Sequence, residues 1–195
     1  MFKITKTDYQ TSGVLGQLVS DYLDRKPELR KFYNEYPDTA GFKNILDSNP
    51  YASLNRTELS DILSKQALLA ENTSAETRHN IALLGDPTTF TVTTGHQLCI
   101  FTGPLYFIIK IFSTINLAEE LKTKFPAHNF VPVYWMASED HDFEEINHLH
   151  LFGKKISWES SQTGAVGEMQ TSGLSEMKET LKELFGNSAH AADLL

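Results

Sequence analysis

Two short polar clusters hold the side chains of this chain that could do chemistry. The first consists of Thr94, Gly95, His96 and Gln97, and the second of Ser138, Glu139, Asp140, His141 and Asp142. Each cluster comes directly after an apolar run. In open α/β sheets, ligands bind beyond the carboxyl ends of the strands, where loops present backbone N–H groups and charged side chains. The two clusters therefore predict a single active site, and with it an enzyme.

The first cluster offers backbone donors. Gly95 is expected to turn the chain from a strand toward a helix, so the N–H groups of the turn could hold an anion with help from the helix dipole. The spacing matches neither a P-loop nor a G-x-G-x-x-G fingerprint. The alternative is that Gly95 only permits the turn, and that His96 is a hydrogen-bonding residue without a ligand.

The second cluster brings three carboxylates and an imidazole together. His141 could act as a general base near neutral pH, and Asp140 or Asp142 could orient it or bind the amine of an amino acid. His148 and His150 follow nearby, so a zinc site is a second interpretation. These two histidines share one face of a predicted strand, whereas the carboxylates lie in the loop before it. A solvated acidic loop without function is the third interpretation.

Three further residues near the clusters are open to a structural or a functional interpretation. Cys99 stands among apolar neighbours, which favours a buried structural thiol over a nucleophile. Lys110 lies inside a long apolar helix, where it either binds a phosphate or carboxylate of a substrate or extends its charge to the surface. Tyr106 is either a core aromatic or part of the site.

The elements that must position these residues form a predicted β-α-β unit. β-branched and aromatic residues predict a strand over 88–94, and a second strand over 130–137. Between them, Gly103-Pro104 opens a helix that is apolar nearly all round and ends near Phe125-Pro126, which is typical of a crossover helix buried against a sheet. A helical turn over 144–147 and a third strand over 148–152 follow.

Helical spacing dominates the N-terminal part of the chain. It predicts a helix capped by Ser12 and ending near Pro27, short helices over 28–36 and 38–47, and longer ones over 59–70 and 74–84. Residues 160–173 are predicted to form a loop, and residues 175–185 an amphipathic helix. We therefore expect a helical region over 1–87 and the first part of a Rossmann-like core over 88–158. A loop and helix over 159–195 are expected to lead into a further part of a longer protein.

Composition narrows the class of protein. The 195 residues are 41% hydrophobic and 22% charged, as in a globular protein with one sizeable core. A formal net charge of -8 disfavours a nucleic-acid partner, which needs a basic surface. The lone cysteine fits a reducing compartment, and the cytoplasm is the expectation. The N-terminus lacks the apolar segment of a signal peptide, and no apolar run is long enough for a membrane span.

Three linked motifs resemble the bacillithiol biosynthesis cysteine-adding enzyme family. They are residues 94–97 (TGHQ), 101–106 (FTGPLY) and 131–148 (VPVYWMASEDHDFEEINH). They occur in the order of the family, and the N-terminal helical part is similar too. The resemblance therefore covers essentially the whole chain.

The resemblance implies an α/β fold: a Rossmann-like parallel sheet core related to the class I aminoacyl-tRNA synthetases, with a coiled-coil arm that mediates homodimerisation. It implies a ligase that joins the carboxyl group of cysteine to the amine of glucosaminyl-malate, with ATP as the expected activating co-substrate. His96, Asp140 and His141 would be catalytic, and no metal is expected. The residues that would bind substrate or nucleotide are Thr94, Gly95, Gln97, Gly103, Tyr106, Lys110, Ser138, Glu139 and Asp142.

Two other functions fit the residues less specifically. A metal-dependent hydrolase would use His141, His148 and carboxylates. A non-catalytic interaction module would present the N-terminal helices and the last helix to a partner. We also expect a chain without the later half of the core to have little or no ligase activity, and its exposed apolar surface predicts a dimer or larger assembly.

Overall fold

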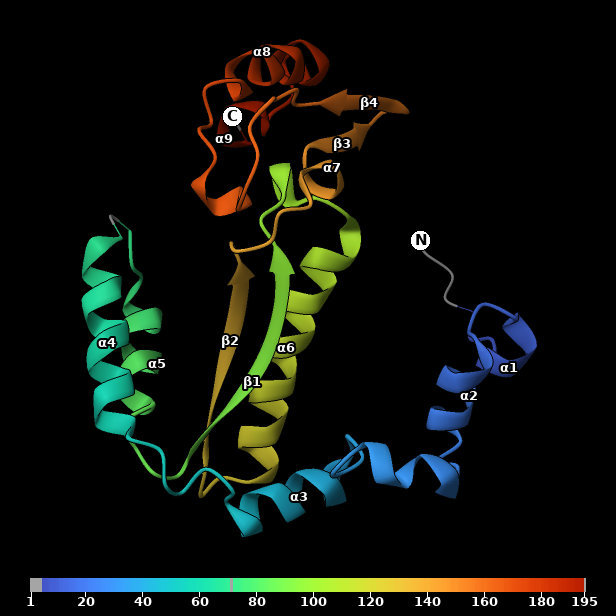
Figure 1. Ribbon diagram of the computed structural model, residues 1–195, viewed down its shortest axis with the longest axis vertical. Helices are drawn as coiled ribbons and strands as arrows, with labels where there is room; N and C mark the ends of the chain where they lie inside the picture. The colour runs from blue at the N-terminus through green and yellow to red at the C-terminus, as the bar shows by residue number, and fades with distance from the viewer. Residues whose placement is uncertain (1–4, 71, 195) are drawn as a thin grey trace. The chain divides into compact units, whose positions relative to one another are not determined.

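Figure 1 shows a computed structural model of the chain, which describes residues 5–70 and 72–194. Spatial clustering divides the chain into two compact units, residues 1–54 and residues 55–195, which we describe one at a time. No helix within the described ranges is long and apolar enough to cross a membrane.

The first unit is built from short helices. They are α1 (Tyr9–Ser12), α2 (Gln17–Leu23), the 3-10 helix η1 (Pro27–Phe32) and α3 (Thr39–Ser48). The prediction of one helix capped by Ser12 and ending near Pro27 is wrong, because Ser12 ends α1 and Gly13 follows with a φ of +65°. The predicted helix over 28–36 is shorter and of the 3-10 type.

Aromatic and charged side chains hold this unit together. The ring centroids of Tyr22 and Tyr36 lie 5.2 Å apart, and the Arg25 guanidinium lies 3.9 Å from the centre of the Tyr36 ring. Arg25 also pairs with Asp38 at 2.9 Å. The Asp38 carboxylate accepts a hydrogen bond from the Gly41 N–H, which caps α3 and is the first cause of the lowered pKa of Asp38. One aspartate thus connects the tyrosine cluster to the start of a helix.

In the second unit, α4 (Arg56–Leu69) and α5 (Ala75–Leu83) form a helical pair. Asn55 and Ser74 cap them, since their side-chain oxygens accept hydrogen bonds from backbone N–H groups of the first turn. The Ser60 hydroxyl of α4 donates to the Ile81 carbonyl of α5 at 3.0 Å. α5 in turn contacts the sheet at β2.

A β-α-β unit forms the centre of the second unit, as predicted. β1 (Thr89–Gln97) and β2 (Asn129–Ala137) pair in parallel, from Thr89 opposite Asn129 to Gln97 opposite Ala137. The helix α6 (Leu105–Lys124) connects the strands and packs against both of them. Its buried residues are Thr114, Ala118 and Leu121. The predicted parallel strands and crossover helix are confirmed, but β1 runs on to Gln97 instead of ending at Thr94.

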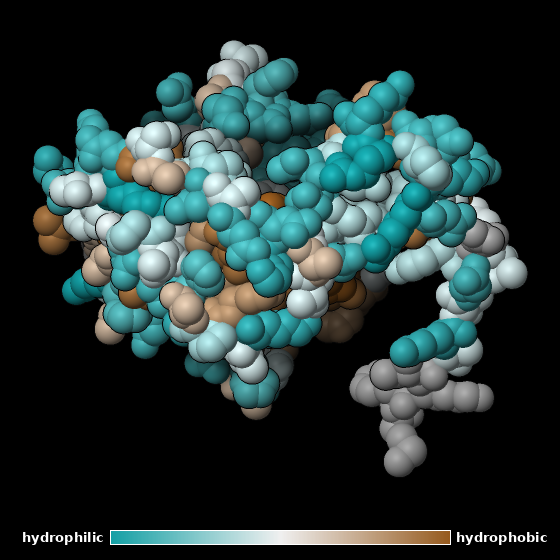
Figure 2. All heavy atoms as spheres, turned by 90° about the horizontal axis from the view of Figure 1, so that it is seen from below, coloured by the Kyte–Doolittle hydropathy of each residue, from teal (hydrophilic) through white to brown (hydrophobic). Residues whose placement is uncertain are grey.

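Only one side of α6 is buried, which differs from the prediction of a helix packed nearly all round. Leu105, Ile109 and Phe112 recur at helical spacing and are 71%, 53% and 60% exposed. Figure 2 shows apolar side chains in brown at the surface among polar side chains in teal, on the face of the molecule seen from below. The apolar composition of α6 therefore exceeds what the described sheet can cover.

A second, antiparallel sheet is a hairpin of β3 (His148–Leu151) and β4 (Lys154–Ser157). The predicted third strand is present, although it ends at Leu151, and β4 was not predicted. Phe152 and Gly153 make the turn with φ values of +50° and +77°, the conformation that two-residue hairpin turns favour. The helix α8 (Leu174–Phe185) packs against the hairpin. The buried core here consists of Leu149, Ile156, Trp158, Met177 and Leu181.

Shorter elements connect these parts. They are η2 (Ile100–Thr102) before α6, α7 (Phe143–Ile146) before β3, η3 (Val166–Glu168) before α8, and α9 (Ala191–Leu194). The predicted helical turn over 144–147 corresponds to α7, and η3 interrupts the predicted loop over 160–173. The two polar clusters lie at the carboxyl ends of β1 and β2.

Candidate functional site

The first polar cluster is the end of a strand, not the turn after one. Thr94, Gly95, His96 and Gln97 pair with residues 134–137 of β2. The parallel ladder thus occupies this segment, and α6 begins only at Leu105. The prediction that these residues form a turn leading directly into a helix N-terminus is therefore wrong.

Gly95 has a steric role within this ladder. A Cβ atom at this position would lie 2.9 Å from the Trp135 carbonyl oxygen and 3.1 Å from the Trp135 Cβ. A side chain here would therefore push β2 away from β1. Gly95 permits the close approach of two strands instead of the predicted turn.

The turn lies further along the chain, between Cys99 and α6. Phe101, Thr102 and Gly103 have consecutive positive φ values of 54°, 67° and 55°. Such a conformation is costly for residues other than glycine and needs support from the surroundings. A Cβ on Gly103 would lie 2.9 Å from the Cys99 Sγ. The Gly103 position is thus set by backbone conformation and by packing against Cys99.

His96 is held at both ring nitrogens. Its Nδ1 lies 3.0 Å from the Gln97 carbonyl oxygen and its Nε2 lies 2.9 Å from the Tyr106 hydroxyl. A carbonyl oxygen can only accept, so we assign the proton to Nδ1. In the neutral ring, Nε2 then accepts a hydrogen bond from Tyr106. Tyr106 is itself 53% exposed.

Lys110 and Tyr134 hold the backbone of the same segment. The Lys110 ammonium group donates to the Gly95 carbonyl, and the Tyr134 hydroxyl donates to the His96 carbonyl at 3.2 Å. Lys110 also lies 5.9 Å from the centre of the Tyr106 ring. Lys110 is half-buried. Its hydrogen bond to the Gly95 carbonyl explains how a charged side chain is accommodated in an apolar helix.

The backbone of the second cluster is held by another segment of the chain. The Gly167 N–H donates to the Ser138 carbonyl at 2.9 Å, and the Val166 N–H donates to the Asp140 carbonyl at 2.7 Å. A Cβ on Gly167 would lie 2.6 Å from the Ser138 Cβ, so the two segments meet closely. The start of η3 thereby holds the loop that carries the acidic residues.

The two aspartates of this loop bind backbone donors. Asp140 accepts from the Asp142 N–H at 2.9 Å, and Asp142 accepts from the Glu145 N–H at 3.2 Å and caps α7. The Asp142 N–H is the main cause of the lowered pKa of Asp140, with smaller contributions from the His141 N–H, the His141 charge and the Gln97 side chain. Asp140 is therefore a carboxylate at neutral pH.

The predicted orientation of His141 by an aspartate is not found. Neither carboxylate of Asp140 and Asp142 bonds to the imidazole of His141 within the described ranges. Glu139 and His141 are exposed and make no side-chain hydrogen bond there. Ser138 is exposed too and makes no side-chain hydrogen bond in this part of the chain, so the side chains of Ser138, Glu139 and His141 are open to a ligand.

A side-chain hydrogen bond connects the first cluster to α7, the helix that follows the second cluster. The Gln97 Nε2 donates to the Glu145 Oε2 at 2.7 Å. The Gln97 side chain also lowers the pKa of Asp140, so Gln97, Asp140 and Glu145 lie together. The sequence reasoning missed Glu145. The spacing Asp142-x-x-Glu145 was the available signal, because it matches a capping box at the start of a helix.

The histidine and carboxylate side chains that could bind a metal do not come together at one point. His148 and His150 have ring centroids 5.4 Å apart, and the Nδ1 of His148 is 3.1 Å from the Asn147 Oδ1. Within residues 5–70 and 72–194, no group of three or more histidine, cysteine, aspartate or glutamate side chains could hold a metal ion. The hydrolase interpretation therefore lacks its metal site in the described part of the chain.

Cys99 is half-buried, and burial raises the pKa of its thiol. The pKa of Tyr134 is also raised. Burial is the larger cause, and the charge that Cys99 carries when ionised is the smaller one. A thiol with a raised pKa is a poor nucleophile at neutral pH, because little of it is thiolate.

The sequence of this chain is similar to a family model and to named relatives of that family. Residues 2–195 match the sequence model described as "Bacillithiol biosynthesis BshC, N-terminal Rossmann-like domain". Relatives named "Putative cysteine ligase BshC" are 48% identical over 92% of this chain in Flavobacterium psychrophilum, 49% over 95% in Flavobacterium johnsoniae, and 36% over 70% in Bacillus pumilus. The chain spans 37%, 35% and 25% of the lengths of these relatives.

Proposed function

Because this chain belongs to the BshC family as its N-terminal Rossmann-like domain, we propose that it forms part of a ligase that joins cysteine to glucosaminyl-malate in bacillithiol biosynthesis. The observation that carries the proposal is the hydrogen bond of 2.7 Å between Gln97 and Glu145, which connects the end of β1 to α7, just after the acidic loop that follows β2. In sheets of this kind, that edge is where ligands bind. The names of the relatives supply the reaction class.

The acidic side of the site suits an amine. Asp140 and Glu145 lie beside Gln97, and the low pKa of Asp140 keeps its charge at neutral pH. We propose that these carboxylates bind the ammonium group of cysteine or of the sugar. The exposed His141 can then accept the proton that the attacking amine loses as the new amide bond forms.

The opposite side of the site suits a carboxyl or phosphate group. At the end of β1, Tyr106 contacts His96, and Lys110 contacts the Gly95 carbonyl and the Tyr106 ring. A free carboxylate needs activation before it can form an amide, and we propose ATP as the co-substrate of that step. Every second N–H of residues 94–97 points away from β2, so we propose that phosphate contacts come from these groups and from the second N–H of the Gln97 amide.

We further propose four properties of the whole protein. They are a core related to the class I aminoacyl-tRNA synthetases, a coiled-coil arm, a homodimer and a cytoplasmic location. The single cysteine and its half-buried place fit a reducing compartment. The assignment of Thr94, Ser138 and Glu139 to substrate binding rests on their positions at the ends of β1 and β2.

The test is an assay of the full-length gene product with cysteine, glucosaminyl-malate and ATP, in which mass spectrometry detects the amide product. We expect Glu145→Ala to lower kcat/KM by about 100-fold, since it removes both a charge and the contact with Gln97. Glu144→Ala is the matched control, because Glu144 is an exposed neighbour with no side-chain bond to the first cluster. Thermal unfolding of both variants separates lost chemistry from lost folding.

Two results would contradict the proposal. One is the absence of amide product from the unaltered protein with any nucleotide. The other is equal activity of Glu145→Ala and Glu144→Ala, which would leave the contact between Gln97 and Glu145 without a role. His96→Ala and Asp140→Ala then show whether each side of the site takes part.

A further inference from the structure

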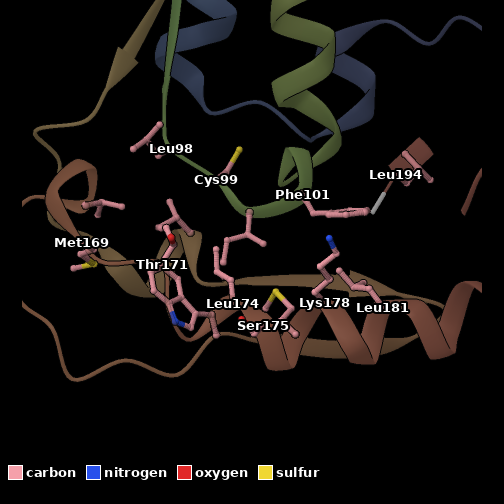
Figure 3. Close-up of a pocket in the computed structure, with 15 residues that line it drawn as sticks. Leu98, Cys99, Phe101, Met169, Thr171, Leu174, Ser175, Lys178, Leu181 and Leu194 are labelled. Carbon is pink, nitrogen blue, oxygen red and sulfur yellow. The ribbon is translucent and has the colours of Figure 1, made fainter. Parts of the chain in front are cut away.

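A cavity of about 600 Å³ lies between the β1–α6 connection and α8 (Figure 3). Residues 98–101 line it on one side, and Leu174, Met177 and Leu181 of α8 line it on another. Met177 and Leu181 also belong to the buried core of the hairpin, so a packed part of the fold supports this wall. The volume and the largely apolar lining are typical of pockets that take small organic molecules.

Polar groups interrupt this lining at a few places. They are the thiol of Cys99, the hydroxyls of Thr171 and Ser175, and the ammonium group of Lys178. Lys178 is the one charged side chain among the lining residues. In Figure 3, its amino group extends from α8 into the space below Phe101. The cavity therefore combines apolar walls with a single positive charge.

Lys178 has no anionic partner within residues 5–70 and 72–194. The next lysine of the same helix behaves differently, because Lys182 pairs with Glu179 at 2.5 Å. The chain has a formal net charge of -8 and thus many carboxylates that could pair with a lysine. An unpaired cation at an apolar cavity is complementary to an anion that carries an apolar body.

We propose that this cavity binds an organic anion with an extended apolar body, of the class of medium-chain carboxylates. The carboxylate pairs with Lys178 and accepts a hydrogen bond from the hydroxyl of Ser175, which lies one turn earlier on α8. The hydrocarbon chain lies along Leu174 and Leu181. This site is separate from the two polar clusters, and it does not depend on the ligase reaction.

The test is calorimetric titration of the 195-residue chain with decanoate and with 1-decanol, its neutral counterpart. We expect decanoate to bind about fivefold more tightly, as one partly exposed ion pair allows. Octanoate should bind at least tenfold more weakly than decanoate, since each buried methylene contributes roughly a factor of four. The variant K178Q should bind decanoate no better than decanol.

K182Q is the matched control, since it removes a lysine of the same helix that does not line the cavity. Its affinity for decanoate should stay unchanged, and backbone amide spectra show whether both variants remain folded. Amide shifts on decanoate binding should fall on residues 98–101 and on α8. Equal affinity for decanoate and decanol, equal loss in both variants, no binding at millimolar decanoate, or shifts confined to the exposed side of α6 would each overturn the proposal.

Discussion

The backbone is held in place both at the end of β1 and after β2, but different groups hold it. At the end of β1, the side chains of Lys110 and Tyr134 bind backbone carbonyls, and His96 is held between a carbonyl and a tyrosine. After β2, the backbone is held by η3 and by the aspartates of the loop itself, while the side chains of Ser138, Glu139 and His141 make no hydrogen bond among the described residues. Polar density in a sequence therefore does not show which side chains support the site and which face a ligand.

The largest effect is expected from a substitution that forces the two strands apart. Gly95→Val places a branched side chain where even a Cβ would lie 2.9 Å from the Trp135 carbonyl oxygen. We expect a loss of about 3 kcal/mol in the free energy of unfolding, as overpacking in a tight contact costs. Chemical denaturation measures it. Thr91→Ser at an exposed position of β1 is the control, and an equal effect of both changes would show that Gly95 has no steric role.

Removing the cation that holds β1 should have the next largest effect. Lys110→Met keeps the apolar stem of the side chain and removes the ammonium donor to the Gly95 carbonyl. We expect destabilisation of about 1.5 kcal/mol, typical of a lost hydrogen bond from a charged donor. Denaturation of Lys178→Met, which removes an unpaired lysine, should show less than about 0.5 kcal/mol. If both changes cost the same, Lys110 does not hold the strand.

A smaller change tests how His96 is held. Tyr106→Phe removes the hydroxyl that donates to Nε2 and leaves the contact of Nδ1 with the Gln97 carbonyl. We expect the proton to stay on Nδ1 and the stability to fall by about 1 kcal/mol or less. Imidazole nitrogen shifts in NMR spectra report the tautomer directly. A proton found on Nε2 in the unaltered chain would contradict our assignment.

The smallest effect is a pH dependence of the loop after β2. The pKa of Asp140 is lowered in the folded chain from an ordinary value of 3.8, chiefly by the Asp142 N–H. The contribution of this carboxylate to stability is therefore complete above that value and is lost only as the pH falls through the lower, folded pKa. Carbonyl NMR shifts of Asp140 should follow that titration, together with the Asp142 amide. In Asp140→Asn the amide should not respond. A midpoint at or above 3.8 would contradict the expectation.

The sequence predicts the β-α-β unit well because its signals are local. β-branched residues mark the strands, and the long apolar run marks α6. The polar end of β1 could not be predicted in the same way, since its pairing with residues 134–137 decides its conformation, and glycine disfavours a strand locally. β4 was missed because Ile156 is its only buried residue, although Phe152-Gly153 could have indicated a hairpin turn.

The candidate site is predicted less completely than the fold. The two clusters follow the two strands as the sequence indicates, and Gln97 and Asp140 lie together. The hydrogen bond between His96 and Tyr106 depends on how α6 packs against β1, and the spacing of residues in the sequence does not predict that packing. The roles of all the proposed site residues, and the boundary at residue 87 between the helical part and the core, remain predictions.

Because the parallel sheet has only two strands in the described ranges, its amides should exchange with solvent at two rates. Along a parallel pair, alternate N–H groups point toward the neighbouring strand, and those between them point outward. Hydrogen–deuterium exchange should therefore alternate residue by residue along β1, with slow and fast amides in turn. Any segment that pairs with the outer side of β1 would slow the fast set alone, so exchange would report a new strand neighbour one amide at a time.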